Sequence, residues 1–538
     1  MDNSAIAERL EAFAGLLDLA GSNPYTSRAY RRAAETIRAT QAPIEVLVRA
    51  GRAQELRGIG PGIAARLQEL VDTGTIGELD ALESEVQPQL VGLGRMLGIG
   101  PARMVEIARA LDISTPDDLR EAARAGRLRE APGVGPKTEE AILARLEQPR
   151  HAPRGLLLNR ARALVDEIAG TLGGAPAGDP RRWADTSFDL AVVAEAARAG
   201  LVLDAFERLP AVVAIVERAA RRALGVTVQG VPVELIVAAP GRFGTELLRA
   251  TGSAAYVDAL GPLPDVPDEA ALYARLGIPW CPPELREAPC TGEPPELVDL
   301  ADVRGDLHCH TTWSDGKATV LEMATAARDL GYEYLAICDH TKSVRVVPGL
   351  DADELRLQAE EIAAANEALA PFSVLRGTEV DIRADGSLDL PDDILAELDW
   401  VQLSLHAGQR EGRDALTHKV TEAMRHPAVT CLSHPQGRII NHRPPNALDL
   451  ERVFEVALET GVALEVNGLP DRLDLSGEHV REAVEAGVPI VASTDAHSVR
   501  GLGNMRLAIA TARRGWATAG DVVNTRPLAG LPLRHARP

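Results

Sequence analysis

Ten of the twelve histidines lie between positions 308 and 497, where short apolar segments repeatedly end in a side chain that can bind a metal ion. Examples are DLHCH, YLAICDH, DWVQLSLH and VASTDAH. The candidate ligands are His308, His310, Asp315, His340, Glu379, His406, His434, Asp495 and His497. Imidazole and carboxylate donors without thiolates are typical of Mn²⁺, Zn²⁺ or Fe²⁺ sites. Nine donors exceed the needs of one ion, so the sequence predicts a centre of two or three ions, with Mn²⁺ or Zn²⁺ as the expected metal.

A metal centre of this kind predicts phosphoester hydrolysis. Bound ions lower the pKa of water, so that hydroxide forms at neutral pH, and they clamp the attacking and leaving oxygens of a phosphoryl group. We assign catalysis, through the metal-activated water, to His308, His310, Glu379 and Asp495. Arg438, in the segment HPQGR, has the guanidinium geometry for bidentate phosphate binding, although a salt bridge is an equally good role for it.

The elements that must position these residues form an alternating pattern from residue 303 onward. Short apolar segments are separated by segments with helical spacing, such as ATVLEMATAARDLG and LERVFEVALETG. Strands that are apolar on both faces and separated by helices indicate a parallel sheet covered on both sides. Seven such units predict a (β/α)7 barrel. The carboxyl ends of parallel strands meet at one mouth, so ligands as distant as His308 and His497 would converge there.

The first 150 residues are expected to be helical, and they contain three related glycine turns. The segments LRGIGPGIAARL, LGIGPARMVEIARAL and APGVGPKTEEAIL carry the glycine pairs Gly58 and Gly60, Gly98 and Gly100, and Gly133 and Gly135. Glycine permits a positive φ and close approach of a ligand, and amides at the following helix N-terminus point at a phosphate oxygen. One such turn is more often only a packing feature. Three in succession favour binding to a DNA backbone without reading its sequence.

The overall composition excludes several classes of function. The net charge is −21 and no basic block exists, so DNA binding cannot rest on a broad electrostatic surface. Aromatic residues make up only 3%, which argues against a base-stacking platform. Neither a signal peptide nor a membrane span is expected, and the five scattered cysteines fit a reduced compartment. We expect a cytoplasmic, nucleoid-associated monomer with DNA as its partner and no membrane contact.

The motifs HCH, SDG, CDH, GTEVD, LSLH, LSHPQGR and STDAH closely resemble the PHP domain, named for polymerase and histidinol phosphatase. The resemblance covers residues 303 to about 526. It implies a trinuclear metal cluster held by the nine positions named above, all of which are filled in this sequence. Gln436 is a small departure, because relatives often have threonine there.

The segment with the three glycine turns resembles helix-hairpin-helix DNA-binding motifs. With these motifs in front and a PHP-like segment behind, the whole chain resembles bacterial family X DNA polymerases. The resemblance implies 3′-5′ exonuclease activity, with cleavage at abasic sites or 3′-end processing as related activities. It also implies that the DNA is a gapped, nicked or 3′-recessed duplex. Gly62 and Arg66 stand where related lyase domains use lysine, so lyase activity is not expected.

The polymerase motif that this resemblance implies is altered. The segment GDPRRWADTSFDLAVV keeps the glycine and the arginine pair of the family pattern, but Asp179 stands where the family has serine. The three expected carboxylate positions are occupied by Ser187, Asp189 and Glu234. Asp185 substitutes for the lost carboxylate only if the strand register shifts. Nucleotidyl transfer needs clustered carboxylates that hold two Mg²⁺ ions, so we expect poor Mg²⁺ binding and an inactive polymerase site.

The predicted fold is a multidomain chain of α and α/β regions. Residues 1–150 form a helical lyase-like region, 151–262 a small α+β nucleotidyltransferase-like domain, 263–302 a thumb remnant and proline-rich linker, and 303–538 the PHP barrel. Four functions are consistent with this domain organisation. A DNA-processing nuclease is favoured. The alternatives are an active gap-filling polymerase with proofreading, a small-molecule phosphatase of the histidinol-phosphatase type, and a DNA-binding scaffold without activity.

Overall fold

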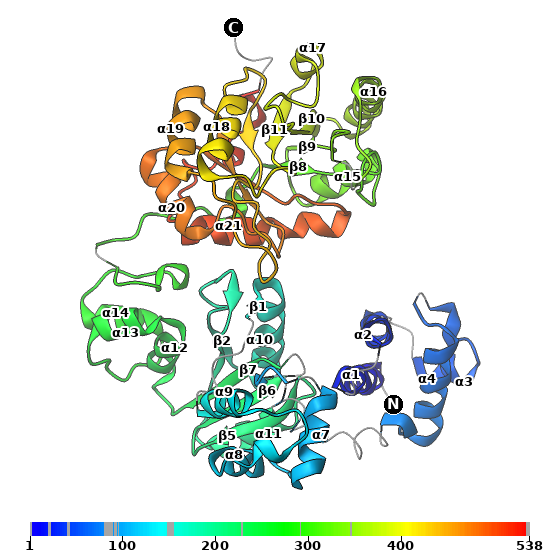
Figure 1. Ribbon diagram of the computed structural model, residues 1–538, viewed down its shortest axis with the longest axis vertical. Helices are drawn as coiled ribbons and strands as arrows, with labels where there is room; N and C mark the ends of the chain where they lie inside the picture. The colour runs from blue at the N-terminus through cyan, green and yellow to red at the C-terminus, as the bar shows by residue number, and fades with distance from the viewer. Residues whose placement is uncertain are drawn as a thin grey trace.

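The structure is a computed structural model, and its elements form helical, α/β and barrel regions along the chain (Figure 1). It describes residues 3–19, 23–39, 44–56, 58–79, 90, 94, 96–99, 101–147, 155–227, 230–290, 292–344 and 347–533. None of the helices formed by these residues has the length and apolar character needed to span a membrane.

The first helical region surrounds one apolar core. Its elements are α1 (Asn3–Leu19), α2 (Pro24–Ala39), α3 (Ile44–Arg49), the 3₁₀ turn η1 (Ala53–Glu55) and α4 (Pro61–Thr73). Buried side chains that include Phe13, Ile37, Leu67 and Leu70 fill the space between these helices. Proline begins both α2 and α4, where its missing N–H leaves no helical hydrogen bond unmade. The helical prediction for this segment is confirmed.

The second helical region rests on the neighbouring sheet. It comprises α7 (Pro101–Leu111), α8 (Pro116–Arg124), η2 (Leu128–Glu130) and α9 (Pro136–Glu147). A capping box starts α8, since Thr115 accepts a hydrogen bond from the Asp118 amide while Asp118 accepts one from the Thr115 amide. Leu119 and Leu128 share one buried cluster with Val216 and Leu224 of the sheet. This packing joins the helices to the α/β region.

The α/β region contains a mixed five-stranded sheet with the order β2-β4-β7-β6-β5. Its strands are β2 (Ala175–Gly178), β4 (Leu190–Glu195), β5 (Val212–Arg218), β6 (Arg222–Thr227) and β7 (Pro232–Ala238). Two helices, α10 (Leu158–Leu172) and α11 (Ala199–Glu207), share a buried cluster with the sheet. A small antiparallel pair, β1 (Leu156–Leu157) with β3 (Thr186–Ser187), lies beside it. Only β4 and β7 pair in parallel within the larger sheet.

A small helical subregion follows the sheet and includes part of the predicted linker. It contains α12 (Phe243–Thr251), α13 (Ala254–Leu260), α14 (Glu269–Leu276) and η3 (Pro283–Leu285). Tyr256, Tyr273 and Cys281 are buried together, and the Arg286 side chain is fully buried beside them. Residues 269–285 are therefore folded rather than extended. Proline precedes and begins only η3, whereas Ser253 and Asp268 cap α13 and α14, so the proline-rich composition concealed the short helices of this segment.

Residues from 305 onward form a parallel seven-stranded barrel. The strands are β8 (Gly305–Cys309), β9 (Tyr334–Ile337), β10 (Ser373–Asp381), β11 (Trp400–Ser404), β12 (Cys431–Leu432), β13 (Ala463–Asn467) and β14 (Ile490–Ser493). Their spatial order follows the sequence, and a parallel bridge between Cys309 and Ala496 brings the first and last strands together. The (β/α)7 prediction is confirmed.

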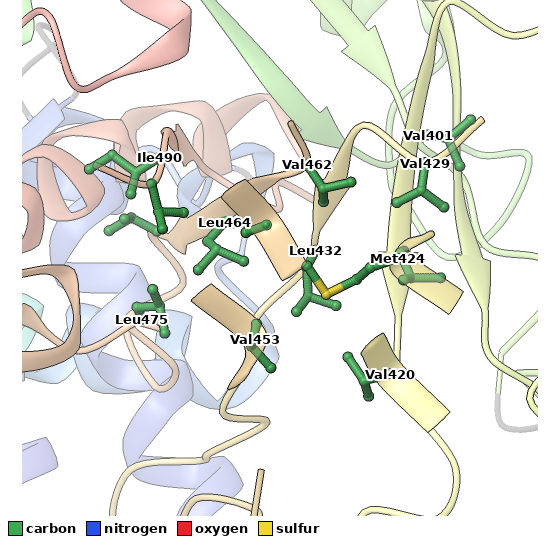
Figure 2. Close-up of a cluster of buried hydrophobic side chains, with 14 of the residues drawn as sticks. Val401, Val420, Met424, Val429, Leu432, Val453, Val462, Leu464, Leu475 and Ile490 are labelled. Carbon is green, nitrogen blue, oxygen red and sulfur yellow. The ribbon is translucent and has the colours of Figure 1, made fainter. Parts of the chain in front are cut away.

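Helices surround the barrel on its outer side. They are α15 (Val320–Asp329), α16 (Ala352–Leu369), α17 (Asp392–Ala396), α18 (Arg413–Met424), α19 (Leu450–Thr460), α20 (Gly477–Ala486) and α21 (Met505–Arg514). Short 3₁₀ turns complete the region: η4 (Leu300–Asp302), η5 (Val499–Asn504), η6 (Val523–Thr525) and η7 (Leu528–Gly530). Figure 2 shows Met424 and Val453 from the helices beside Leu432 and Leu464 from the strands. This apolar layer fixes the strands, so that their carboxyl ends hold constant positions.

Candidate metal centre

The candidate ligands lie at the carboxyl ends of the barrel strands or in the loops after them. His308 belongs to β8 and Glu379 to β10, while the others follow their strands: His310, Asp315, His340, His406, His434, Asp495 and His497. Eight of the nine form three groups whose ligand atoms lie within 4.8 Å of one another. The groups are His310, Asp315, His340 and His497; His308, His310 and Asp495; and His340, Glu379 and His406. Shared members make the three groups contiguous.

Glu379 lies among several imidazoles. Its Oε1 atom lies 2.9 Å from His434 Nε2 and 3.5 Å from His406 Nε2. Its Oε2 atom lies 2.8 Å from His340 Nδ1 and 3.7 Å from His308 Nε2. The carboxylate is almost fully buried. The barrel therefore also places His434, the ninth candidate, against the shared carboxylate.

Two buried ring nitrogens test whether the residues fit a metal centre. His310 Nδ1 and His340 Nδ1 make no hydrogen bond within the part of the chain that the structure describes. Buried polar atoms are normally paired, and both nitrogens face carboxylate oxygens instead. His310 Nδ1 lies 3.9 Å from Asp315 Oδ1, and His340 Nδ1 lies 2.8 Å from Glu379 Oε2. Nitrogen lone pairs facing carboxylates are an arrangement that cations satisfy, so the donor set fits metal ions.

The electrostatics favour metal-binding protonation states at His310 and Asp315. Burial lowers the pKa of His310 to about 4, and the positive charges of His340 and His497 act in the same direction. Burial raises the pKa of Asp315, but a hydrogen bond from His497 and the charge of His310 outweigh it and bring the value to about 2. At neutral pH His310 is therefore a neutral donor and Asp315 an anion, as metal binding requires. Burial lowers the pKa of His308, His340 and His497, but neighbouring carboxylates outweigh it and raise the pKa of all three, so these imidazoles must lose a proton when a metal ion binds.

The backbone is unusual at two of the candidate ligands. His434 has φ 25° and Asp495 has φ 51°, in the left-handed region that side chains other than glycine rarely adopt. Both conformations are held by neighbours. The His434 amide donates to Glu465 Oε2 at 2.7 Å, and Asn467 Nδ2 donates to Asp495 Oδ2 at 2.9 Å. Such strain concentrates at functional sites, where the surrounding fold maintains it.

Sequence reasoning missed two buried carboxylates behind the ligands. Glu465 of β13 accepts hydrogen bonds from His308 Nδ1 at 2.6 Å and from the Ser433 hydroxyl at 3.0 Å. Asp381 Oδ1 lies 3.2 Å from His406 Nδ1 and accepts the His406 amide at 3.0 Å. A carboxylate on Nδ1 turns Nε2 toward the ligand set. The available signal was that β13 is the one barrel strand with no candidate ligand at its end.

Arg438 contacts the α/β region. Its Nε atom donates to the Arg472 carbonyl at 2.8 Å, and its Nη2 atom lies 2.6 Å from Asp185 Oδ2. Nearby, Asn441 Nδ2 donates to the Gly155 carbonyl at 3.0 Å. Figure 1 shows the loop between β12 and α19 extending from the barrel toward β1 and α10. The described contacts of Arg438 correspond to the salt-bridge role, and phosphate binding by this residue stays a prediction.

The altered polymerase motif lies around β4 and β7. Asp179 Oδ2 accepts hydrogen bonds from the amides of Phe188 and Asp189, at 2.7 and 2.9 Å. Ser187 is fully buried and its hydroxyl has no hydrogen-bond partner among the described residues. Glu234 pairs in register with Ala191, which puts it on the same sheet face as Asp189, two positions along the strand.

These acidic residues do not form a metal-type cluster. Within the described ranges, neither Asp189 nor Glu234 joins a group of three potential ligands within 4.8 Å. The carboxylate of Asp185, the possible substitute, forms an ion pair with Arg438 of the barrel.

The glycine turns have the geometry that the sequence predicted for the residues described. Gly58, Gly98 and Gly133 have φ values of 90°, 75° and 70°. The apolar residues Ile59 and Val134, between the glycines of the first and third turns, are buried and anchor them. Gly100 lies outside the described residues.

In each of the two later turns, the first glycine lies against an arginine from the helix that follows the other turn. An added Cβ at Gly98 would meet the Arg145 guanidinium of α9, and one at Gly133 would meet the Arg103 guanidinium of α7. By contrast, an added Cβ at Gly60 or Gly135 would meet no atom within 4 Å. The backbone at Gly60 and Gly135 is therefore open to a ligand.

Comparisons with known families agree with this architecture. Residues 1–76 match the helix-hairpin-helix domain, residues 92–148 the SAM-like helix-hairpin-helix tandem, and residues 306–467 the PHP domain. The fold and the site thus define a multidomain protein in which helix-hairpin-helix regions precede a PHP barrel.

One relative spans the whole protein. The chain is 32% identical to the "DNA polymerase/3'-5' exonuclease PolX" of Bacillus subtilis, over 98% of each chain. It therefore belongs to the PolX family. Over part of its length the chain is also similar to a "Probable phosphatase" of Acetivibrio thermocellus, 30% identical over 36% of this chain and 78% of the relative. A "Probable phosphatase" of Thermoanaerobacter is 28% identical over 41% of this chain and 89% of the relative.

Proposed function

We propose that this protein is a DNA-repair nuclease whose PHP barrel removes nucleotides from DNA 3′ ends in the presence of Mn²⁺ or Zn²⁺. The observation that carries this proposal is the convergence of imidazoles and carboxylates at the barrel mouth, in three groups whose ligand atoms lie within 4.8 Å of one another. The name of the full-length relative, which joins polymerase and 3′-5′ exonuclease, supports the same direction of hydrolysis. Abasic-site cleavage and 3′-end processing are related activities of the same chemistry.

The barrel residues would hold two or three ions, with His310 and His340 shared between neighbouring groups. Such ions supply a hydroxide at neutral pH and compensate charge on the phosphoryl oxygens. The protein's own contribution is orientation. Glu465 fixes the tautomer of His308 and Asp381 that of His406, so both Nε2 atoms face Glu379.

The helix-hairpin-helix regions would bind the DNA backbone. The open backbone at Gly60 and Gly135 lies directly before α4 and α9. Amides at a helix N-terminus attract a phosphate oxygen, and glycine allows the close approach this needs. This mode of binding requires no basic surface, which suits a chain with a net charge of −21. Gapped, nicked or 3′-recessed duplexes are the proposed ligands.

We further propose that the α/β region no longer polymerises DNA. Both arginines of the motif form ion pairs with carboxylates of this chain. Arg181 Nη2 lies 2.7 Å from Glu269 Oε2, and Arg182 pairs with Asp179 and Glu287. Asp179 brings a negative charge where the family pattern puts serine. With Ser187 in place of a carboxylate, the Mg²⁺ pair lacks one of its ligands.

A labelled primer-template separates this proposal from its alternatives. The DNA carries a 3′ label or a 5′ label and is incubated with Mn²⁺, with and without dNTPs. Shortening from the 3′ end is the expected result. Primer extension would favour an active polymerase. Intact DNA together with hydrolysis of a phosphate monoester would favour a phosphatase, the activity named for two of the shorter relatives. Binding without turnover would favour a scaffold.

A double substitution tests the site itself. His308→Ala with His310→Ala should abolish hydrolysis but leave DNA binding unchanged, since the helix-hairpin-helix regions lie elsewhere in the chain. The matched control is His418→Ala, an exposed histidine on α18. Normal DNA degradation by the double variant would show that the site assignment is wrong.

A further inference from the structure

A cavity of about 660 Å³ opens beside the metal centre. It is lined by the loops after β11 and β12, including His406, Arg410, His442, Arg443, Pro444 and Asn446. His406 belongs to both places, since its Nε2 atom also lies 3.5 Å from Glu379 Oε1. A molecule in this cavity would therefore extend directly to the candidate ligands.

Positive charge gathers along this cavity, although the chain as a whole is acidic. Arg410 is exposed and makes no ion pair within the described part of the chain. Arg443 donates through Nε to the Gly437 carbonyl at 2.9 Å, which fixes its side chain and leaves its other nitrogens available. Glu411 is an acidic group on the lining, and Lys419 Nζ pairs with it at 2.5 Å. The arginines are thus not neutralised by that acid.

A third arginine connects this charge to the metal centre. Arg472 Nε lies 4.0 Å from Asp495 Oδ2, one of the candidate ligands. Its Nη1 atom is buried and has no hydrogen-bond partner among the described residues. Burial and the positive charge of Arg472 lower the pKa of Arg443. The negative charge of Asp474 opposes this shift, and the charge of Arg410 adds to it, so the pKa stays below its ordinary value. Three guanidinium groups thus face two carboxylates, Asp474 and Asp495, and an anion in the cavity would compensate the remaining positive charge.

We propose that Arg410, Arg443 and Arg472 bind successive phosphates of the DNA strand whose end is hydrolysed at the metal centre. This inference rests on the proposed nuclease function and adds how that site distinguishes a DNA strand from a small phosphate ester. Arg472 contacts the phosphate nearest the metal ligands, while Arg443 and Arg410 contact those farther along the cavity. Guanidinium groups suit this task because each presents paired donors to phosphate oxygens.

Hydrolysis of a long and a short substrate tests the proposal. The full chain and its Arg410→Ala/Arg443→Ala variant are assayed with Mn²⁺ on a 3′-recessed duplex and on thymidine 5′-p-nitrophenyl phosphate. The variant should show a KM for the duplex raised roughly tenfold or more, with hydrolysis of the small diester unchanged. Arg356→Ala/Arg452→Ala removes the same charge from exposed helix positions and should change neither rate. Arg410→Lys/Arg443→Lys should restore part of the loss.

Salt dependence gives a measurement that does not require hydrolysis. Binding of a labelled single strand is followed by fluorescence anisotropy in EDTA at several salt concentrations. Each phosphate contact on single-stranded DNA contributes about 0.7 to the slope of log K against log[salt], so removal of two should make the slope about 1.4 less negative. The control pair of substitutions should leave the slope unchanged.

The outcomes are distinguishable. An unchanged slope and unchanged KM in the Arg410→Ala/Arg443→Ala variant would overturn the inference, as would equal losses on both substrates. If the wild-type chain hydrolyses neither substrate but the slope still changes, the proposed nuclease function fails while the phosphate-binding cavity stands.

Discussion

At the scale of single residues, the site depends on side chains that touch no substrate. Glu465 is fully buried and accepts hydrogen bonds from His308 Nδ1, from Ser433 and from the His434 amide. It therefore fixes one candidate ligand through its ring and another through its backbone. The carboxylate stays ionised because the positive charge of His308 and its hydrogen bond lower the pKa of Glu465 despite burial.

Glu465→Gln should preserve the fold and weaken metal binding. The amide has nearly the same shape, but a neutral oxygen is a weaker acceptor for the His308 ring. Loss of such a carboxylate behind a histidine ligand typically costs about 10–100-fold in metal affinity or activity. Titration of hydrolysis with Mn²⁺ measures the change, and Glu455→Gln on the exposed face of α19 is the control. An unaltered Mn²⁺ titration would show that Glu465 does not orient His308 toward a metal.

At the scale of elements, the first glycine of each turn has a structural role, and the second glycine of the first and third turns has the proposed binding role. Gly58, Gly98 and Gly133 have positive φ, so substitution there would strain the backbone whatever their function. Gly60 and Gly135 have open space where a Cβ would stand.

Gly60→Ala and Gly135→Ala should therefore weaken DNA binding with only a small loss of stability. A methyl group fits the fold at either position but stands where a phosphate must approach the backbone. We expect a several-fold rise in the Kd for gapped duplex, measured by anisotropy, with the thermal midpoint little changed. Gly170→Ala, also with no atom within 4 Å of its added Cβ, is the control. Equal affinity in all variants would contradict backbone binding at these turns.

Helix α14 is joined to the sheet region by a buried ion pair. Glu269 Oε2 lies 2.7 Å from Arg181 Nη2, and Glu269 Oε1 lies 2.5 Å from Arg286 Nη1. Burial raises the pKa of Glu269, but the hydrogen bond from Arg181 and the charge of Arg286 lower it below its ordinary value of 4.5. A lowered pKa means that the carboxylate stabilises the fold fully above pH 4.5, and that this contribution is lost as the pH falls through the folded pKa.

Glu269→Gln should destabilise the protein at pH 7 by about 3–5 kcal/mol, because it leaves the fully buried Arg286 without its counter-charge. The difference from wild type should shrink as the pH is lowered from 5 toward 3, since wild-type Glu269 then becomes protonated. Urea unfolding across this range measures both effects. Glu293→Gln, at an exposed position, is the control. A difference that stays constant over the whole pH range would exclude an ionised Glu269.

At the scale of the whole molecule, the barrel mouth faces the region that resembles a polymerase. Arg438 and Asp185 form an ion pair between them, and Leu158, Leu473 and Leu507 form a small apolar cluster at the same contact. The residue that sequence reasoning offered as a substitute polymerase ligand, Asp185, thus contacts the barrel instead.

A double-mutant cycle on this pair distinguishes the two roles considered for Arg438. If the pair joins the domains, Arg438→Ala and Asp185→Asn should lower stability with a coupling energy of about 0.5–3 kcal/mol. Neither should change hydrolysis of a small phosphodiester. Reduced hydrolysis in Arg438→Ala alone would instead support direct phosphate binding. Arg413→Ala, an exposed arginine on α18, is the control.

The sequence allowed prediction of the barrel and its nine candidate ligands because the carboxyl ends of parallel strands, and the loops directly after them, meet at one mouth. Glu465 was missed because it lies inside an apolar strand, and the only signal for it was that this strand, β13, has no candidate ligand at its end. Arg472 was missed because its place beside Asp495 depends on a loop conformation, which local pattern does not specify. Residues 263–302 were predicted as a thumb remnant and proline-rich linker. The sequence did not show which part is folded, because the burial of Glu269 and Arg286 depends on contact with distant partners.

The metal content of the purified full chain shows whether the barrel mouth is a metal centre. After incubation with Mn²⁺ and removal of the excess, inductively coupled plasma mass spectrometry should find two or three ions per chain. The same measurement on His308→Ala/His310→Ala should find fewer, together with lost hydrolysis. A metal-free wild-type chain whose hydrolysis added Mn²⁺ does not restore would contradict the central claim.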